Sequence, residues 1–284
     1  MITQLDRVGL IVSDGDRSAK FYTECLGMEL VSQRGGDRVV PIVGTVFDVP
    51  GAIIRSLIRL SKGAFYLVLF EFEPRGRQRA LRVNNPGGLT LGLASENVEE
   101  DYRRLRTSAP DLLTPPTSRG GRKVCFASDP DGVVAGFVEN LGEGIEALVS
   151  ITASDAAQSA AFYTNFGLTP CPEFDDTSDA DHKVIGMRLG PVAFQFNEYL
   201  RDKGTERASP MNNVGALQLD FFSDNVDADY KRLDDYGATV ISPPVSTGRG
   251  VASTGFDPNG VMWELSSDDG IRPKTPEYYR NIYR

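Results

Sequence analysis

Alternating apolar and polar residues open the chain. Residues 5–12 alternate and are rich in branched side chains, which predicts a β-strand. Ser13 or Asp14 can cap the helix that follows and runs through Cys25, and Gly27 supplies a left-handed residue that ends it. Three further strands are predicted, at 29–33, 52–60 and 65–72. The first 72 residues therefore predict one β-α-β-β-β unit.

The same pattern follows a second time. Residues 89–94 predict a strand, and Asn97 can cap a helix that runs to about Thr107. The sequence Asp-Pro-Asp-Gly at 129–132 predicts a turn, because proline presets φ and glycine accepts a positive φ. Two further strands are predicted between the helix and the turn, at 112–113 and 123–127, and one after the turn, at 133–139.

Both units then recur in the second half of the chain. Residues 97–105, NVEEDYRRL, return as NVDADYKRL at 225–233, and the turn at 129–132 returns as Asp-Pro-Asn-Gly at 257–260. Nearer the N-terminus, SAKFYT at 18–23 returns as SAAFYT at 159–164. Repetition over this length indicates two homologous halves, each made of two β-α-β-β-β units.

The predicted fold class is therefore α+β, with four β-α-β-β-β units that form two tandem domains with curled mixed sheets. A short linker with two glycines lies at 140–144. We predict a first domain at 1–142, a second domain at 143–270, and a C-terminal tail at 271–284.

Composition narrows the range of partners. The 284 residues provide enough chain for two cores, and no apolar run approaches the roughly 20 residues of a membrane span. A net charge of -9 disfavours nucleic acid, and three widely spaced cysteines favour free thiols in a reducing cytoplasm. No basic-then-apolar leader opens the sequence. We expect a cytoplasmic protein with a small-molecule partner, as a monomer or a homodimer.

The repeated units resemble the vicinal oxygen chelate superfamily, which includes glyoxalase I, bleomycin-resistance proteins and extradiol dioxygenases. The resemblance rests on Phe21-Tyr22-x-x-x-Leu-Gly27, on Phe162-Tyr163 with Gly167, and on the two Asp-Pro-[Asp/Asn]-Gly turns. It implies that paired units curl into a half-barrel cup. Inward residues on four strands, usually His or Gln, Glu, His and Glu, hold a divalent metal there for Lewis-acid chemistry.

Carried onto this chain, the resemblance implies an incomplete metal site. The four positions fall on Arg7, Val68, Thr90 and Gly136 in the first domain, and on Leu148, Gln195, Gln218 and Glu264 in the second. A guanidinium has no lone pair to offer, and valine, glycine and leucine have no ligand atom in the side chain. The single histidine, His182, falls in a polar loop outside these positions. We expect no metal cofactor, although a hard cation held by two amides and one carboxylate stays an alternative.

The candidate catalytic residues are Glu264, Gln218 and Gln195, which should face one concavity. Glu264 would be the general acid or base, and the two glutamines would orient oxygen atoms of the substrate. The competing interpretation is that the three residues form a hydrogen-bonded polar cluster in a cup without activity. Arg7 and Thr90 are the candidate substrate-binding residues. Arg7 would hold an anionic group or form an ion pair between domains. If the domains exchange halves, Arg7 would face Gln218 and Glu264 across one cup.

The expected function is an enzyme that acts on a small oxygenated metabolite, anionic or aromatic, by metal-independent acid–base chemistry of the isomerase or lyase type. Two alternatives stay open: a ligand-sequestering protein similar to bleomycin-resistance proteins, and a metalloenzyme of the glyoxalase or extradiol dioxygenase type with an atypical ligand set.

Basic residues are concentrated in two loops, at 75–82 and at 201–207. Two interpretations of these loops stay open: a solvated surface loop, or a basic lid over the cup.

Overall fold

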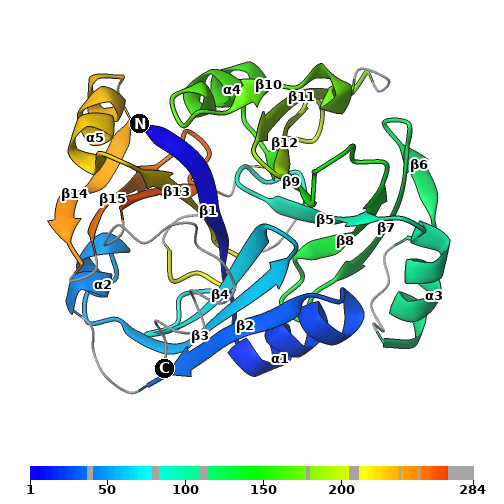
Figure 1. Ribbon diagram of the computed structural model, residues 1–284, viewed down its shortest axis with the longest axis horizontal. Helices are drawn as coiled ribbons and strands as arrows, with labels where there is room; N and C mark the ends of the chain where they lie inside the picture. Colours follow the sequence, from blue (N-terminus) through cyan, green and yellow to red (C-terminus); the bar gives the residue numbers. More distant parts are fainter. Residues whose placement is uncertain are drawn as a thin grey trace.

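The computed structural model describes residues 1–36, 41–78, 83–108, 114–176, 180–204, 211–236, 238–247 and 250–267. In this part of the chain the strands form two eight-stranded mixed sheets that lie beside each other (Figure 1). The α+β class predicted from the sequence is confirmed. The strand predicted at 112–113 and the tail at 271–284 lie outside the described residues.

One sheet, here called the terminal sheet, combines the first unit with the last. Its strand order is β14-β15-β16-β13-β1-β4-β3-β2. The strands are β1 (Ile2–Ile11), β2 (Glu29–Gly35), β3 (Ile53–Lys62), β4 (Phe65–Glu73), β13 (Leu217–Ser223), β14 (Thr239–Ser246), β15 (Val251–Phe256) and β16 (Met262–Ser266). Antiparallel pairing of β1 with β13 joins the two units at the centre of the sheet.

The other sheet, here called the central sheet, combines the second unit with the third. Its strand order is β10-β11-β12-β9-β5-β8-β7-β6, and β5 pairs antiparallel with β9 at its centre. The strands are β5 (Leu89–Ser95), β6 (Thr117–Arg119), β7 (Arg122–Ser128), β8 (Val134–Glu139), β9 (Ala147–Thr152), β10 (Thr169–Pro170), β11 (His182–Leu189) and β12 (Val192–Tyr199). The two halves of the sequence therefore exchange units within one chain.

Each unit places its main helix after its first strand. The helices are α1 (Gly15–Lys20), continued by a π-helical turn at Phe21–Cys25, α3 (Val98–Ser108), α4 (Ala156–Thr164) and α5 (Val226–Asp235). Asp14 caps α1 by accepting from Arg17 N at 2.9 Å, and Gly27 has the expected positive φ of 68°. An additional helix, α2 (Pro41–Val46), was not predicted, because six residues are too few to show a helical period.

The two sheets share one apolar core. Leu10, Leu91, Phe194 and Trp263, one from each unit, are buried in the same cluster. Two smaller clusters lie apart from it, one on each sheet. Among the described residues, no helix is long and apolar enough to cross a membrane.

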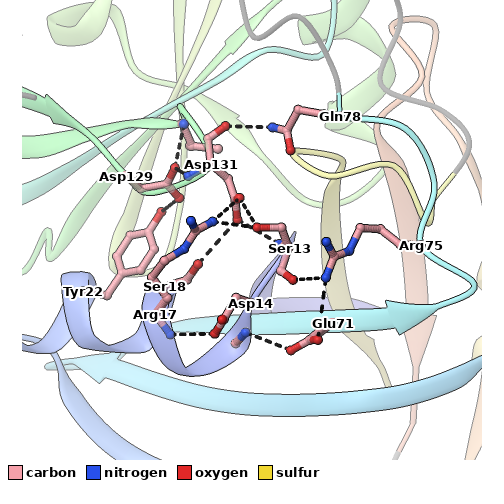
Figure 2. Close-up of polar contacts among 12 residues, drawn as sticks. Ser13, Asp14, Arg17, Ser18, Tyr22, Glu71, Arg75, Gln78, Asp129 and Asp131 are labelled. Atoms are coloured by element: carbon pink, nitrogen blue, oxygen red, sulfur yellow. Dashed lines mark hydrogen bonds and ion pairs between the residues drawn. The ribbon is translucent and has the colours of Figure 1, made fainter.

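The turn at 129–132 fixes the start of α1, which belongs to the other sheet (Figure 2). Asp131 accepts hydrogen bonds from Ser13, at its backbone N (2.9 Å) and its hydroxyl, and forms an ion pair of 3.0 Å with Arg17. Tyr22 donates its hydroxyl to Asp129 at 3.1 Å. The turn therefore ties the central sheet to the terminal sheet.

The turn at 257–260 repeats this connection in the opposite direction. Asn259 accepts from Ser154 N at 2.9 Å and donates to Ser159 Oγ at 2.9 Å, while Tyr163 donates to Asp257 at 3.1 Å. A neutral amide here stands where Asp131 stands in the first turn. Both turns were predicted from the sequence, but their contacts with a helix of another unit were not.

Candidate functional site

The four family positions of the terminal sheet lie on β1, β4, β13 and β16, as Arg7, Val68, Gln218 and Glu264. Strand register brings three of these strands together: Arg7 is paired with Asp220 on β13, and Asp220 with Glu264 on β16. The expectation that Arg7 would face Gln218 and Glu264 if halves were exchanged is therefore confirmed. We call this concave face the terminal cup.

A buried ion-pair network occupies the base of the terminal cup. Arg7 Nη2 lies 2.6 Å from Asp220 Oδ2 and 3.2 Å from Glu264 Oε2, and Arg7 Nη1 lies 3.2 Å from Asp6 Oδ2. Gln218 Nε2 donates a hydrogen bond to Glu264 Oε2. The ion pair that the sequence offered as one interpretation of Arg7 is thus present, and Glu264 is one of its partners.

A second guanidinium belongs to the same network. Arg59, on β3, is buried and lies 3.9 Å from Asp6. Among the described side chains, the guanidinium groups of Arg7 and Arg59 face the carboxylates of Asp6, Asp220 and Glu264. Such a group of charges is stable away from water only because opposite charges are in contact.

An apolar chamber of about 200 Å³ lies above this network. Arg7, Arg59 and Glu264 form its polar end. Its other walls are largely apolar, and they are lined by Ile42, Val43, Val46, Phe47, Ile54, Leu57, Val68, Phe70 and Thr247. The unpredicted helix α2 supplies part of these walls, and Thr254 on β15 donates a buried hydrogen bond of 2.6 Å to Val46 O.

The central sheet carries a larger and chemically different cavity. Its four family positions are Thr90, Gly136, Leu148 and Gln195, none of them charged. The cavity measures about 630 Å³, and its lining includes the hydroxyls and amides of Thr90, Ser118, Ser150, Thr152, Gln195, Asn197 and Tyr199. We call it the central cup.

Two expectations from the sequence are wrong. Gln195 lies on β12 in the central cup, where it donates to Phe174 O at 2.7 Å, and therefore does not share a concavity with Gln218 and Glu264. His182 is not a residue of the acidic loop but the first residue of β11. It is half-buried, lines the central cup, and its ring centroid lies 4.3 Å from that of Tyr199.

Comparison with known proteins agrees with this architecture. The family model described as "Glyoxalase/Bleomycin resistance protein/Dioxygenase superfamily" matches residues 4–137 and 145–265. The chain belongs to this superfamily.

Individual members resemble the chain more distantly. Lactoylglutathione lyase of Schizosaccharomyces pombe is 22% identical over 179 residues, which span 58% of this chain and 59% of that protein, less than two thirds of its length. Glyoxalase I from Zea mays superposes with a TM-score of 0.70 at 17% identity, covering 93% of this chain and 92% of that one. A putative dioxygenase from Bacillus subtilis has a TM-score of 0.64 at 15% identity, covering 98% and 90%. At these identities the solved structures support the fold alone.

The metal that the superfamily resemblance implies does not fit the residues of either cup. In the terminal cup the guanidinium of Arg7 lies among the oxygens of Asp220 and Glu264 that a cation would use, and Val68 has no ligand atom. In the central cup, Thr90 and Gln195 are the family positions with a side-chain oxygen. Within the described ranges, no group of three His, Cys, Asp or Glu residues could hold a metal ion.

Two side chains of the basic loops, Arg75 and Lys203, contact helix starts. Arg75 donates to Ser13 O and pairs with Glu71, which accepts from Gly15 N at 2.9 Å (Figure 2). In the second half, Lys203 donates to Ser154 O at 3.3 Å and pairs with Glu198 at 2.8 Å. These two side chains therefore fix the starts of α1 and α4, which supports a structural role over the lid interpretation. Residues 79–82 and 205–207 lie outside the described part.

Cys125 shows no sign of nucleophilic activation. Its burial in the core raises the pKa of the thiol to about 11, with a smaller contribution from the negative charge of Asp101. The thiol therefore stays protonated at neutral pH.

Proposed function

We propose that the terminal cup binds a small, neutral, largely apolar molecule that carries oxygen, and that Glu264 transfers a proton to or from it without a metal. The observation that carries the proposal is the position of Glu264. Its carboxyl group lies where the apolar chamber meets the buried ion pairs, within reach of Arg7 and Gln218. A carboxylate held in this way at the wall of an apolar cavity is suited to acid–base chemistry.

The sequence left two classes of ligand open, anionic and aromatic. The apolar walls of the chamber favour the aromatic class. An apolar cavity of about 150 Å³ holds benzene, so a chamber of about 200 Å³ has room for one substituted ring. Arg7 is already in contact with the carboxylates of Asp6, Asp220 and Glu264. An anionic ligand would have to compete with these carboxylates for the guanidinium.

The roles of the neighbouring residues follow from their contacts. Gln218 is not among the residues that line either cavity, so we assign it a positioning role: its amide holds one oxygen of Glu264. Arg7 contacts the same oxygen, Oε2, and so helps to fix the position of the carboxyl group. The ligand would then approach from the apolar side, with its acidic C–H or O–H directed at Glu264.

Solvent deuterium exchange tests this proposal without knowledge of the product. Neutral aromatic ketones, phenols and aldehydes would be screened for binding, and each binder would then be incubated with the protein in D₂O. We expect deuterium to enter the ligand at a carbon next to its oxygenated group. Glu264→Gln should reduce the exchange rate by at least about 100-fold. The control is Glu99→Gln, which changes an exposed carboxylate that pairs with Lys123. Equal exchange rates in Glu264→Gln and wild type would refute the role of Glu264.

A second candidate function is ligand capture in the central cup. The observation that favours it is the volume of about 630 Å³ with an uncharged set of family positions, Thr90, Gly136, Leu148 and Gln195. The hydroxyl and amide groups of this lining can hold a polar ligand by hydrogen bonds. Saturable binding that Gln195→Ala weakens, with no deuterium exchange and no product, would support capture over catalysis.

A further inference from the structure

The charged residues of the terminal cup can be compared with their equivalents in the central cup, because both sheets have the same register. Arg7 pairs with Asp220 and Asp220 with Glu264, just as Leu148 pairs with Gly92 and Gly92 with Gly136. Arg7 of one cup is thus replaced by leucine in the other, and two of its three carboxylate partners, Asp220 and Glu264, are replaced by glycine.

The remaining charges of the network follow the same rule. Asp6 precedes Arg7 as Ala147 precedes Leu148. Arg59 pairs with Val68 across β3 and β4, as Gly186 pairs with Gln195 across β11 and β12. All five charged positions of the terminal cup are therefore uncharged in the central cup. The charges occur together in one cup and are replaced together in the other, which indicates that they act as one unit.

We propose that the guanidinium of Arg7 takes the place of the divalent metal, so that the terminal cup contains a cation that belongs to the chain itself. Arg7 stands at the first of the four family ligand positions. Its Nη2 lies 2.6 Å from Asp220 and 3.2 Å from Glu264. Its positive charge offsets the negative charges of these two carboxylates, which are buried on adjacent strands.

The geometry also explains why a guanidinium and a metal exclude each other. Both need the same carboxylate oxygens, and both are positive, so an ion that entered the cup would have to displace the head group of Arg7. A guanidinium offers donors and no lone pair, and therefore cannot join a coordination shell. This inference concerns the charge of the cup and holds whether or not the cup turns over a ligand.

Replacement of Arg7 by histidine tests the inference directly. Arg7→His places an imidazole at the first ligand position and frees Glu264 and Asp220, which are ligand types that suit Zn²⁺. Wild type, Arg7→His and Arg7→Lys would be incubated with excess Zn²⁺, desalted, and measured by elemental mass spectrometry. We expect stoichiometric zinc in Arg7→His, with a melting temperature that rises on addition of zinc. Wild type and Arg7→Lys should retain only trace amounts.

A charge-balance pair keeps the inference testable if Arg7→His does not fold. Arg7→Met removes the cation and should lower the melting temperature strongly or abolish folding. Arg7→Met/Asp220→Asn removes one carboxylate as well and should recover part of the loss. The inference is overturned if wild type binds stoichiometric zinc that Glu264→Gln removes, or if folded Arg7→His gains no zinc. It is also overturned if the double variant is no more stable than Arg7→Met.

Discussion

Two buried aspartates at equivalent positions of the repeat have unusual proton affinity. Burial raises the pKa of Asp129 to about 6, although hydrogen bonds from the backbone of Val133 and Asp131 oppose the change. Burial likewise raises the pKa of Asp257 to about 6, against hydrogen bonds from Val261 and Asn259. Each of the two carboxyl groups also accepts a hydrogen bond from a buried tyrosine.

These raised values predict the pH dependence of stability. The pKa of each aspartate is higher in the folded state than in the unfolded state, so the folded protein binds the proton more tightly. The resulting stabilisation is complete below about pH 4 and is lost as the pH rises through about 6. A rise from 3.8 to about 6 corresponds to roughly 3 kcal/mol per group. The neutral variant Asp129→Asn/Asp257→Asn should therefore lose less stability than wild type between pH 4.5 and pH 7.

Urea unfolding of both proteins at several pH values measures this difference. The comparison with wild type cancels the contributions of other groups, such as Asp229, whose pKa is lowered mainly by hydrogen bonds that outweigh its burial. Parallel curves of unfolding free energy against pH for wild type and variant would show that the two aspartates keep ordinary pKa values.

At the scale of elements, α2 is an unpredicted helix that supplies part of the wall of the terminal cup. This helix belongs to the first unit, but it contacts β14 and β15 of the last unit. Thr254 on β15 donates to the carbonyl of Val46 at the end of α2. Phe47, next to it, packs on Phe70 and Phe72 with ring centroids 5.6 and 5.4 Å apart. One wall of the chamber is therefore held in place by contacts between the first and last units of the chain.

Thr254→Val should loosen α2 without opening a cavity. The substitution conserves volume but leaves the Val46 carbonyl without its buried donor, at a cost of about 1–2 kcal/mol. We expect faster amide hydrogen exchange at 42–49, measured by mass spectrometry. The matched control is Ser253→Ala, which removes a buried hydroxyl that donates to Ser242 O at 2.9 Å on β14. If both variants increase exchange in this segment equally, Thr254 does not anchor α2.

Local sequence signals predicted most elements but few of the distant contacts. Asp14, Gly27 and the two Asp-Pro turns act through their own φ angles and neighbouring backbone groups, so their effect can be read from a few residues. Helix α2 has no such signal, and its position depends on Thr254 more than 200 residues later. His182 was misassigned because its polar neighbours concealed the start of β11.

At the scale of the whole molecule, the pairing of units decides which candidate residues meet. Four similar units present similar edges, so the pattern of a single strand does not specify its partner in the other half. The second half was therefore taken to hold Gln195, Gln218 and Glu264 in one cup. The observed pairing sends Gln195 to the central cup and brings Arg7, from the other end of the chain, to Glu264.

This pairing predicts how the protein behaves when it is divided. A cut at 142/143, the predicted domain boundary, leaves each half with one unit of the terminal sheet and one unit of the central sheet. Both central contacts, β1 with β13 and β5 with β9, would be lost. Each half alone would expose two long unpaired edges and part of the shared core. We expect neither half to be a cooperatively folded monomer, and the two halves to recover the native sheets when they are expressed together.

Size-exclusion chromatography with light scattering and near-UV circular dichroism would test this expectation on halves expressed alone and together. A stable one-to-one complex with the near-UV spectrum of the intact protein is the expected result, because Trp263 is buried in the core that both halves share. Arg7→Met in the first half should weaken the complex, because it removes the ion pairs to Asp220 and Glu264 in the other half. The control is Arg104→Met, which breaks an exposed ion pair within the first half. Two separate monomers with cooperative unfolding would show that the sheets form within each half and would contradict the exchanged pairing.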